Sequence, residues 1–376
     1  MKRRSKKFYF FNILLAIVAI WALVVWLDQD SVAVLHEDAS AYNLARADEA
    51  PGVVCEERVI PVALEPGGKL YNLVGDLCFP EEFASGNKQN TLQVLISGAG
   101  YGSVYWDFPY KPDTYSYMRA ALRAGDTTFN FDRLGMGESD HPFGILLDVD
   151  RQAHVLHQVI TALTTEASYA AVVTLGHSFG SVIALSHALT HPDQVDGLVL
   201  TGYAHNVNPE FGPSMGQSID VAAFKGPFVG DVFDPTYVVS KNNSRGDAFY
   251  TLSNTEKEVV EVDNLTRQTT AAGELITMSK YFADQSKKLQ VPTYMILGED
   301  DFVVCGGELD CTNHEAVAAN EAPYFPPQTC FELTVLEDTK HNASLHRNAP
   351  EVFELMLGWI YRRAGSAGEP PLEPCV

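Results

Sequence analysis

Continuous apolar runs alternate with amphipathic stretches through most of the chain. TLQVLISGAG, TTFNFDRLGMG, the run AAVVTLGH and QVDGLVLTG read as buried strands, whereas SYMRAALRAG, residues 148–166 and the stretch after Gly180 read as helices. Helices between continuous apolar strands are typical of a parallel sheet covered on both faces. CEERVIPVAL and KLYNLVGDLC flank a Pro-Gly-Gly turn, so they predict an antiparallel hairpin ahead of that sheet.

This alternation stops at about residue 204 and returns at VPTYMILG, which is followed by CFELTVLED and the closing helix NAPEVFELMLGWIYRRAG. The intervening residues 204–285 are rich in Asn, Ser, Gly and scattered aromatics. An insertion of this size predicts a cap or lid on a core formed by residues 53–203 and 286–376. Its aromatics either line an apolar pocket or build a small core of the insertion itself, and we expect the small core.

The amino terminus carries a long apolar run. Residues 1–7, MKRRSKK, contain five basic residues, and residues 8–27 are apolar except for Asn12. About 20 apolar residues can span a bilayer as a helix. Basic residues before the run and acidic ones after it place the amino terminus in the cytosol. We therefore expect a signal anchor at 8–27, an acidic stem at 28–52, and the rest of the chain in the lumen or outside the cell. A cleaved signal peptide, which would release a secreted protein, is the alternative.

The charge excludes one class of partner. The formal net charge is −22 and the pI is about 4.8. Nucleic-acid binding needs clustered Lys and Arg, so nucleic acid is not an expected partner. An acidic surface also serves solubility, and it therefore says little about the substrate.

Cysteines and glycosylation sequons both fit an oxidising compartment. Six cysteines allow 15 pairings, and buried free thiols are the alternative to any of them. The pairings that we favour bracket the first hairpin, close a short loop and tie down the tail: Cys55–Cys78, Cys305–Cys311 and Cys330–Cys375. The sequons are Asn242, Asn264 and Asn342.

The strand ending at residue 177 leads into Gly176-His177-Ser178-Phe179-Gly180 and then into a helix. In a nucleophile elbow, a strand turns sharply into a helix and holds a serine Oγ exposed at the top of the sheet. The strained backbone of the serine requires small residues two positions before and after it, and Gly176 and Gly180 stand there. The pattern predicts that Ser178 is a nucleophile.

A second match to the same pattern, Gly212-Pro213-Ser214-Met215-Gly216, lacks this context. It follows AHNVNPEF, which is polar and broken by proline, rather than a strand. Pro213 also fixes its own φ and has no N–H to donate. We interpret this copy as a loop.

From about residue 91 to 364 the chain resembles the α/β-hydrolase fold superfamily, in particular its capped serine hydrolase branch of esterases, lipases and peptidases. The resemblance rests on SGAGYG, DRLGMGES, the elbow with the following HPDQVDGLVLTG, and two late loops that carry acidic residues and histidines. It implies a mostly parallel sheet with helices on both faces, an inserted cap, and the chain order nucleophile, acid, histidine.

The resemblance places the acid in the loop after VPTYMILG, which reads Gly298-Glu299-Asp300-Asp301. The family usually has its acid three residues after the glycine. That position is Asp301, and Glu299 and Asp300 are the alternatives.

The histidine is expected in the loop after the last strand. His341 comes soon after that strand and has a leucine four residues later, as in the family's pattern. The alternative, His346, lies near the start of the closing helix, where it would be a surface or capping residue. The predicted triad is Ser178, Asp301 and His341, in which the imidazole takes the serine proton and the carboxylate fixes the imidazole tautomer.

Acyl chemistry also needs two backbone N–H donors for the oxyanion. By the resemblance, one donor is Phe179 and the other is Ala99 or Gly100 in the glycine loop. Relatives commonly have His-Gly where this chain has Ser97-Gly98, so the donors are retained while their supporting contacts differ.

Several other polar residues are interpreted as structural. The pairs His154/His157 and His187/His191 each lie one helical turn apart, but without a third ligand each pair predicts helix packing rather than a metal site. His177 is expected to be structural, and Asp132 and Arg133 to brace the loop beside the site. We therefore expect neither a metal nor a cofactor.

A serine at the elbow implies attack on an acyl carbonyl, because fold relatives that open epoxides carry an aspartate there. The leading hypothesis is a serine hydrolase that cleaves a carboxylic ester, lactone or thioester in a small-molecule acyl substrate. Acyl transfer is one alternative. Aminopeptidase activity is another, which an acidic cap site for the free amine would favour. A non-catalytic binding module is the last alternative, although such modules often lose a triad member.

Overall fold

The computed structural model describes residues 50–83, 90–225, 228, 234–365, 370–373 and 375. The predicted basic tail, the predicted span at 8–27 and nearly all of the predicted stem lie outside these residues. Within them, no helix combines the length and the apolar character that a membrane crossing requires.

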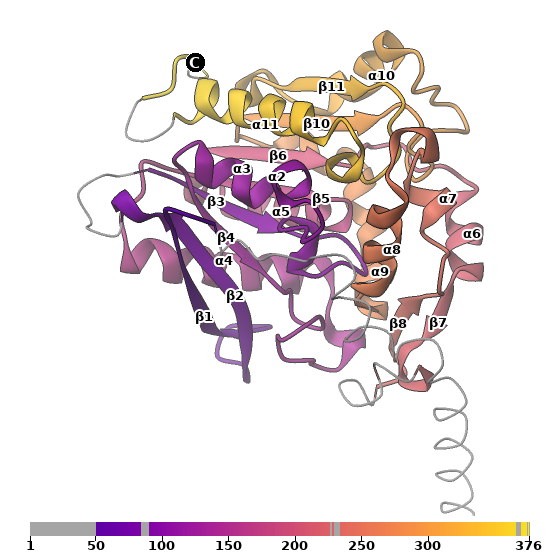
Figure 1. The fold of residues 1–376 in the computed structure, drawn as a ribbon, viewed down its shortest axis with the longest axis horizontal. Helices are drawn as coiled ribbons and strands as arrows, with labels where there is room; N and C mark the ends of the chain where they lie inside the picture. The colour runs from indigo at the N-terminus through magenta and orange to yellow at the C-terminus, as the bar shows by residue number, and fades with distance from the viewer. Residues whose placement is uncertain are drawn as a thin grey trace, which may run out of the picture.

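The centre of the molecule is an eight-stranded sheet (Figure 1). In spatial order its strands are β1 (Val53–Ala63), β2 (Leu70–Pro80), β4 (Thr127–Phe131), β3 (Thr91–Ile96), β5 (Ala171–His177), β6 (Gly197–Thr201), β10 (Thr293–Gly298) and β11 (Glu332–Leu336). The first two strands form the predicted hairpin, and β2 pairs antiparallel with β4. From β4 to β11 every pairing is parallel. The mostly parallel sheet expected from the sequence is confirmed.

Helices cover both faces of this sheet. The helices α4 (Val149–Glu166) and α5 (Phe179–Thr190) share one hydrophobic cluster with Val94 and Ile96 of β3. On the other face, α3 (Tyr117–Arg123) and α11 (Ala349–Arg363) pack in a second cluster with Leu95. Neighbouring residues of one strand thus face opposite sides, which explains why both faces need apolar residues and the strand reads as a continuous apolar run. Two further helices of the core are α2 (Pro112–Tyr115) and α10 (His314–Glu321).

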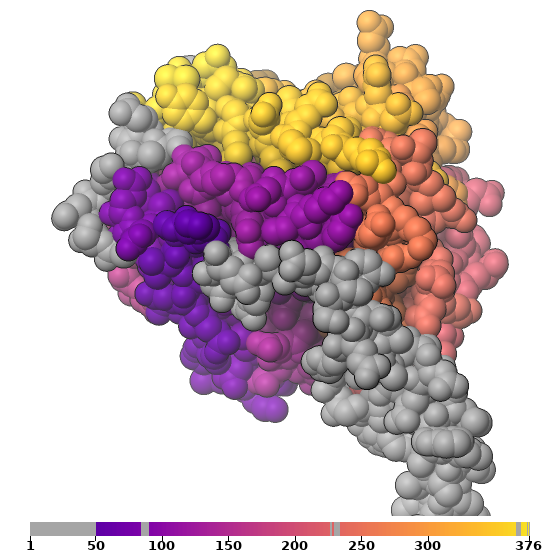
Figure 2. Space-filling view, viewed as in Figure 1, coloured from indigo at the N-terminus to yellow at the C-terminus, as the bar shows by residue number. Residues whose placement is uncertain are grey.

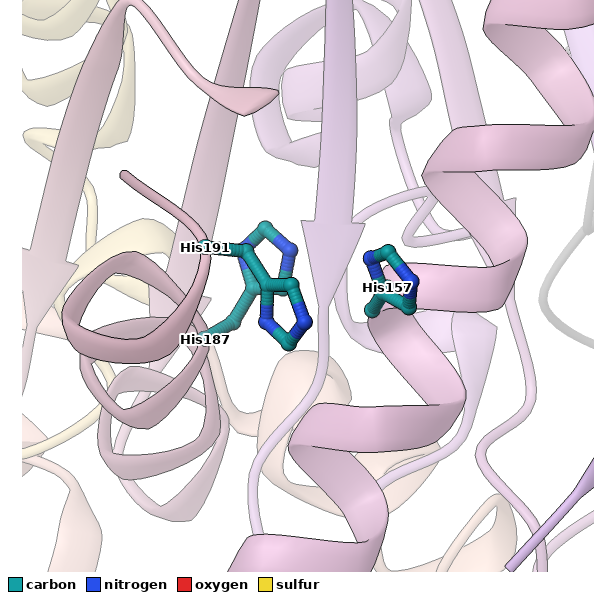
Figure 3. A group of neighbouring side chains, drawn as sticks. All are labelled: His157, His187 and His191. Carbon is teal, nitrogen blue, oxygen red and sulfur yellow. The ribbon is translucent and has the colours of Figure 1, made fainter. Parts of the chain in front are cut away.

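The packing of α4 against α5 corrects one prediction. One ring nitrogen from each of His157, His187 and His191 lies within 4.8 Å of the others. Figure 3 shows the three rings gathered between the two helices. The pair His187/His191 was expected to lack a third ligand because sequence spacing compares residues within one helix. Here the third imidazole comes from the neighbouring helix.

Between β6 and β10 the chain forms a separate layer at the carboxyl ends of the sheet strands (Figure 1). It contains a three-stranded antiparallel sheet of β7 (Ile219–Val221), β8 (Tyr237–Ser240) and β9 (Thr269–Ala271). Its helices are α6 (Phe211–Gln217), α7 (Gly246–Phe249), α8 (Lys257–Leu265) and α9 (Ala272–Thr277). We call the residues between β6 and β10 the insertion.

The insertion packs directly on the core. Figure 2 shows the segment near residue 260 side by side with the segment near residue 110 and with the start of the closing helix. Glu256 accepts hydrogen bonds from Tyr110, Lys111 and Tyr115 at 3.0, 2.6 and 3.0 Å, so one carboxylate ties several core side chains to the insertion.

Helix α6 corrects a second prediction. The second serine pattern, expected to be a loop, lies inside this helix. Pro213 falls in the first helical turn, where a residue needs no intrahelical acceptor for its N–H, so the proline is tolerated. No strand leads into α6, and Ser214 therefore does not sit at a strand-to-helix turn.

Three disulfide bonds cross-link the described part of the chain, and they are the pairings that we favoured from the sequence: Cys55–Cys78, Cys305–Cys311 and Cys330–Cys375. The first joins directly opposed residues of β1 and β2. The second closes the loop after β10, and the third ties the residues beyond α11 to the start of β11. The alternative of buried free thiols is wrong for these six residues.

Candidate active site

Ser178 occupies the sharp turn between β5 and α5. Its backbone has φ 53° and ψ −118°, a conformation that an L-residue adopts at a cost. Its N–H donates to the Thr201 carbonyl at 2.7 Å. A Cβ atom at Gly176 would lie 2.4 Å from Ser181 Cα, and one at Gly180 would lie 2.2 Å from the Ile96 carbonyl oxygen. Both glycines are therefore sterically required, as the sequence pattern predicted.

The structure brings Asp301 and His341 together at the carboxyl ends of β10 and β11. Nδ1 of His341 lies 3.0 and 2.9 Å from the two carboxylate oxygens of Asp301. Both side chains are buried, and Asp301 also accepts the Val303 N–H at 2.9 Å. Because the carboxylate only accepts hydrogen bonds, Nδ1 carries the imidazole proton and Nε2 is left as a base.

Glu299 and Asp300, the alternatives to Asp301 as the triad acid, have other partners or face solvent. Glu299 accepts the Asp338 N–H at 2.8 Å, and Asp300 is exposed. Asp301 is thus the carboxylate of this loop that contacts His341.

The expectation that His346 would be a surface or capping residue is wrong. His346 is buried, and its Nε2 accepts the N–H groups of Thr251 and Lys340 at 3.0 and 3.3 Å. Its Nδ1–H donates to the Asn342 carbonyl at 2.9 Å. Burial lowers the pKa of His346 to about 4, so the ring is neutral and both of its nitrogens are occupied in holding loops together. Sequence position could not reveal this burial, because Thr251 belongs to the insertion and lies 95 residues from His346 along the chain.

The glycine loop after β3 passes over the elbow. A Cβ atom at Gly98 would lie 3.1 Å from the Ser178 Cβ, and Ala99 and Gly100 border the same pocket as Ser178. Phe179 is the first residue of α5, so its N–H has no intrahelical acceptor. The three residues predicted as oxyanion donors therefore lie around Ser178.

Arg133 braces this loop, as expected. Its Nε donates to the Ser97 carbonyl at 3.1 Å and its Nη2 donates to the Gly98 carbonyl at 3.3 Å. Asp132 accepts the N–H of Ser103 at 2.7 Å and so holds the segment that follows the loop. These contacts support the loop in a chain that lacks the family's His-Gly pair.

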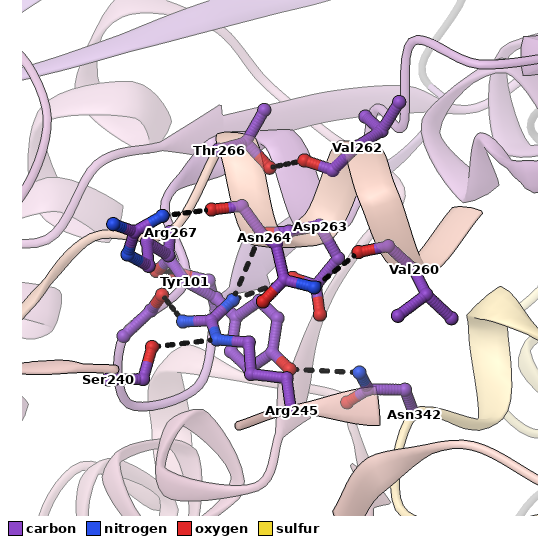
Figure 4. A network of polar contacts seen from close by, with 12 residues as sticks. Tyr101, Ser240, Arg245, Val260, Val262, Asp263, Asn264, Thr266, Arg267 and Asn342 are labelled. Atoms are coloured by element: carbon purple, nitrogen blue, oxygen red, sulfur yellow. Dashed lines mark hydrogen bonds and ion pairs between the residues drawn. The ribbon is translucent and has the colours of Figure 1, made fainter. Parts of the chain in front are cut away.

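Two charged residues of the insertion reach the same loop and were missed by sequence reasoning (Figure 4). Arg245 and Asp263 form an ion pair at 2.6 Å, and each side chain is 2% exposed. Arg245 also donates to the Gly100 carbonyl, and its guanidinium lies 4.3 Å from the centre of the Tyr101 ring. No motif marks these residues, because their roles follow only from the docking of the insertion on the core.

His177, expected to be structural, connects this network to the histidine loop. Its Nε2 lies 3.2 Å from Asn342 Oδ1, and its Nδ1 lies 3.1 Å from Thr201 Oγ1. Asn342 in turn donates to the Tyr101 hydroxyl at 2.8 Å. Burial lowers the pKa of His177 well below its ordinary value, which keeps the ring neutral in this role.

A narrow cavity of about 90 Å³ lies over the elbow. Ser178 and His341 border it together with Ala99 and Gly100. Apolar side chains of the insertion form most of its remaining wall: Phe211, Met215, Ile219, Val238, Val239, Phe249 and Leu275. Phe211 and Phe249 therefore line an apolar pocket. The buried Tyr237 and Tyr281 pack in the hydrophobic cluster of α4 and α5, and Tyr250 packs in that of α3 and α11, rather than in the separate small core that we expected.

A wider groove of about 730 Å³ lies beside this cavity. Phe302 of the groove and Phe211 of the cavity meet edge to face with ring centres 6.5 Å apart. The groove is acidic, and the carboxylates that line it are Asp247, Glu299, Asp300, Glu308 and Asp310.

A second Ser–His–acid arrangement occurs in the structure but has no access to solvent. His205 Nδ1 lies 2.6 Å from Glu321, and its Nε2 lies 2.8 Å from Ser286 Oγ. Ser286 and Glu321 have no exposed surface, and the Tyr324 ring stacks on the imidazole at 3.8 Å. We interpret this cluster as a structural link between the insertion and the core, because a substrate could not reach its serine.

Comparisons with known proteins identify the fold and the family of this chain. The family model of serine aminopeptidase S33 matches residues 114–320, more than half of the chain. That range includes Ser178 and Asp301 and ends before His341.

One curated relative is epoxide hydrolase 3 of Xenopus tropicalis, 29% identical over 122 residues. The match covers 32% of this chain and 30% of the relative.

Solved structures share the fold at low sequence identity. A peroxisomal α/β-hydrolase of Saccharomyces cerevisiae has a TM-score of 0.53 and 14% identity, covering 84% of this chain and 90% of that chain. An esterase of Exiguobacterium antarcticum has a TM-score of 0.54 and 18% identity, covering 81% of this chain and 99% of that chain. A thermophilic esterase of Thermogutta terrifontis has a TM-score of 0.52 and 18% identity, covering 81% of this chain and 98% of that chain. The chain is an α/β-hydrolase and belongs to the serine aminopeptidase S33 family.

Proposed function

We propose that this hydrolase cleaves small carboxylic esters through a triad of Ser178, Asp301 and His341. The observation that carries the proposal is the Asp301–His341 contact at one cavity with Ser178, which sits on a positive-φ elbow. A serine at the elbow favours attack on an acyl carbonyl over the opening of an epoxide, the reaction that the name of the curated relative gives.

The proposed reaction needs no cofactor. His341 Nε2 takes the Ser178 proton as Oγ attacks the ester carbonyl, and the N–H groups of Phe179 and of Ala99 or Gly100 stabilise the oxyanion. The departing alcohol takes the proton from His341 and leaves an acyl group on Ser178. A water molecule, deprotonated by His341, then attacks this acyl group, and the carboxylic acid is released as Ser178 regains its proton.

The cavity favours a short acyl group. Its volume of about 90 Å³ is far below the 300–1,000 Å³ that is typical of ligand pockets. Its wall is mostly apolar, and Arg245 in that wall is already paired with Asp263, so a charged acyl group would lose its hydration without a free partner. The alcohol part of the ester would extend toward the wider groove.

A panel of p-nitrophenyl esters tests this specificity. We expect kcat/KM to be highest for acetate or butyrate and to fall at least ten-fold for octanoate and palmitate. Phe211→Ala removes part of the cavity wall and should relax this limit, whereas Leu252→Ala, at a residue that is 58% exposed, should leave it unchanged. A kcat/KM that rises steadily toward palmitate would contradict the proposal.

Aminopeptidase activity is the second candidate, because the groove beside the cavity is acidic. Carboxylates there could bind the free amine of an aminoacyl substrate. Aminoacyl p-nitroanilides in the same assay separate the two functions. Faster turnover of an anilide than of every ester would favour the peptidase.

We also propose that the protein works beyond the cytosol, held by the anchor predicted at residues 8–27. Three disulfides support this location, because such bonds persist in oxidising compartments.

The sequons give this location a test. Asn342 is fully buried and hydrogen-bonded to Tyr101, and Asn264 is buried in α8, whereas Asn242 is exposed. We expect glycopeptide mass spectrometry of protein from a secreting eukaryotic host to find a glycan at Asn242 and none at Asn342. A glycan at Asn342 in active protein would contradict the packing around His177 and His341.

A further inference from the structure

We propose that His157, His187 and His191 form a binding site for a divalent transition metal such as Zn²⁺, and that the metal links α4 to α5. Imidazole nitrogen is a preferred ligand of Zn²⁺, Cu²⁺ and Ni²⁺. The site is independent of the proposed ester hydrolysis. Ser178 immediately precedes α5 and His191 immediately follows it, so the twelve residues of that helix, about 18 Å, separate the two.

The rings are close enough for one metal ion, but because they now stack nearly parallel, the side chains must rotate to aim their nitrogens at one point. One nitrogen from each ring lies within 4.8 Å of the others, and the rings of His157 and His191 stack with centres 4.0 Å apart. Bonds of 2.0–2.1 Å to a tetrahedral zinc ion place ligand nitrogens about 3.3 Å apart. His157 and His191 are only partly buried, so their rings can make this approach while His187 stays fixed in the core.

Gln194 already orients two of the three rings. Its Oε1 lies 2.8 Å from His157 Nδ1 and 3.0 Å from His187 Nε2, while its Nε2 donates to Thr161. Since the amide oxygen only accepts hydrogen bonds, both of these ring nitrogens carry protons. The lone pairs are therefore left on Nε2 of His157 and Nδ1 of His187. Metal-binding histidines almost always donate their second N–H to such an acceptor.

The free nitrogen of His187 is the second observation that points to a ligand. His187 is fully buried, and within the described residues its Nδ1 has no hydrogen-bond partner. A buried polar atom left unpaired is costly, and a bound metal would satisfy it.

The test uses chelator-treated full-length protein without a polyhistidine tag, titrated with Zn²⁺ and with Co²⁺ as a spectroscopic probe. We expect saturable binding of one ion per chain, visible Co²⁺ absorption bands of a nitrogen-ligated site, and a higher thermal midpoint with Zn²⁺. His157→Gln and His191→Gln should each weaken binding at least ten-fold. Gln194→Ala should weaken it by about 10–100-fold, because it removes the acceptor that orients the rings.

His314→Gln is the matched control, because His314 is exposed on α10, outside the cluster. It should bind Zn²⁺ as the unmodified protein does. Circular dichroism and ester hydrolysis should be unchanged in His157→Gln and His191→Gln, which separates loss of the metal from loss of the fold or of the active site. Failure to bind one ion per chain, or equal affinity in the variant that carries both substitutions, would overturn the proposal.

Discussion

Ser178→Ala is expected to lower kcat on p-nitrophenyl acetate by a factor on the order of 10⁴–10⁶. The substitution removes the oxygen that attacks the carbonyl but leaves the oxyanion donors and the cavity in place. Alanine keeps the same Cβ at the positive-φ position, so the elbow should retain its shape. A serine-directed phosphonate probe should label the unmodified protein and fail to label this variant, which protein mass spectrometry measures directly.

The chain carries its own control for this experiment. Ser214 stands in the second copy of the serine pattern, but it lies in α6 and not at a strand-to-helix turn. Ser214→Ala should therefore keep both the activity and the labelling. Labelling at Ser214, or full activity in Ser178→Ala, would refute the assignment of the nucleophile.

Asp301→Asn is expected to lower kcat by about 10⁴-fold, with little change in KM. Asparagine can turn its N–H toward His341 Nδ1, which would move the imidazole proton to Nε2. A protonated Nε2 cannot accept the Ser178 proton. KM should change little because Asp301 is fully buried behind His341 and does not line the cavity.

Asp300→Asn provides the comparison at the adjacent residue. Asp300 is exposed and loses the same charge on substitution, so its kcat should stay close to that of the unmodified protein. A larger loss in Asp300→Asn than in Asp301→Asn would show that the neighbouring carboxylate is the acid. Steady-state kinetics on one ester substrate measure both variants.

Features that depend on local periodicity could be predicted from the sequence. The strands of the core, the long helix before the elbow and the closing helix all follow from runs of apolar residues. The elbow was recognisable because its two glycines are required by contacts within a few residues and with the adjacent strand. The pairing Cys55–Cys78 was favoured because the two cysteines bracket the predicted hairpin, and the register of β1 and β2 places them opposite each other.

Features that depend on the docking of distant segments could not be predicted. Arg245 and Asp263 reach the glycine loop only because the insertion packs on the core. The Nε2 of buried His346 accepts the N–H of Thr251, which lies 95 residues away in the insertion. The residues themselves carry no local pattern that marks these roles.

The sequence by itself determined the parallel sheet and the serine at the elbow, because each depends on patterns within a short stretch of chain. The expected order of nucleophile, acid and histidine came from the resemblance to the α/β-hydrolase superfamily. Only the tertiary structure decided that Asp301 contacts His341, that the insertion narrows the cavity to about 90 Å³, and that His157 joins His187 and His191. These facts depend on distances between segments that are far apart in the chain, and such distances are set by packing rather than by the spacing of residues.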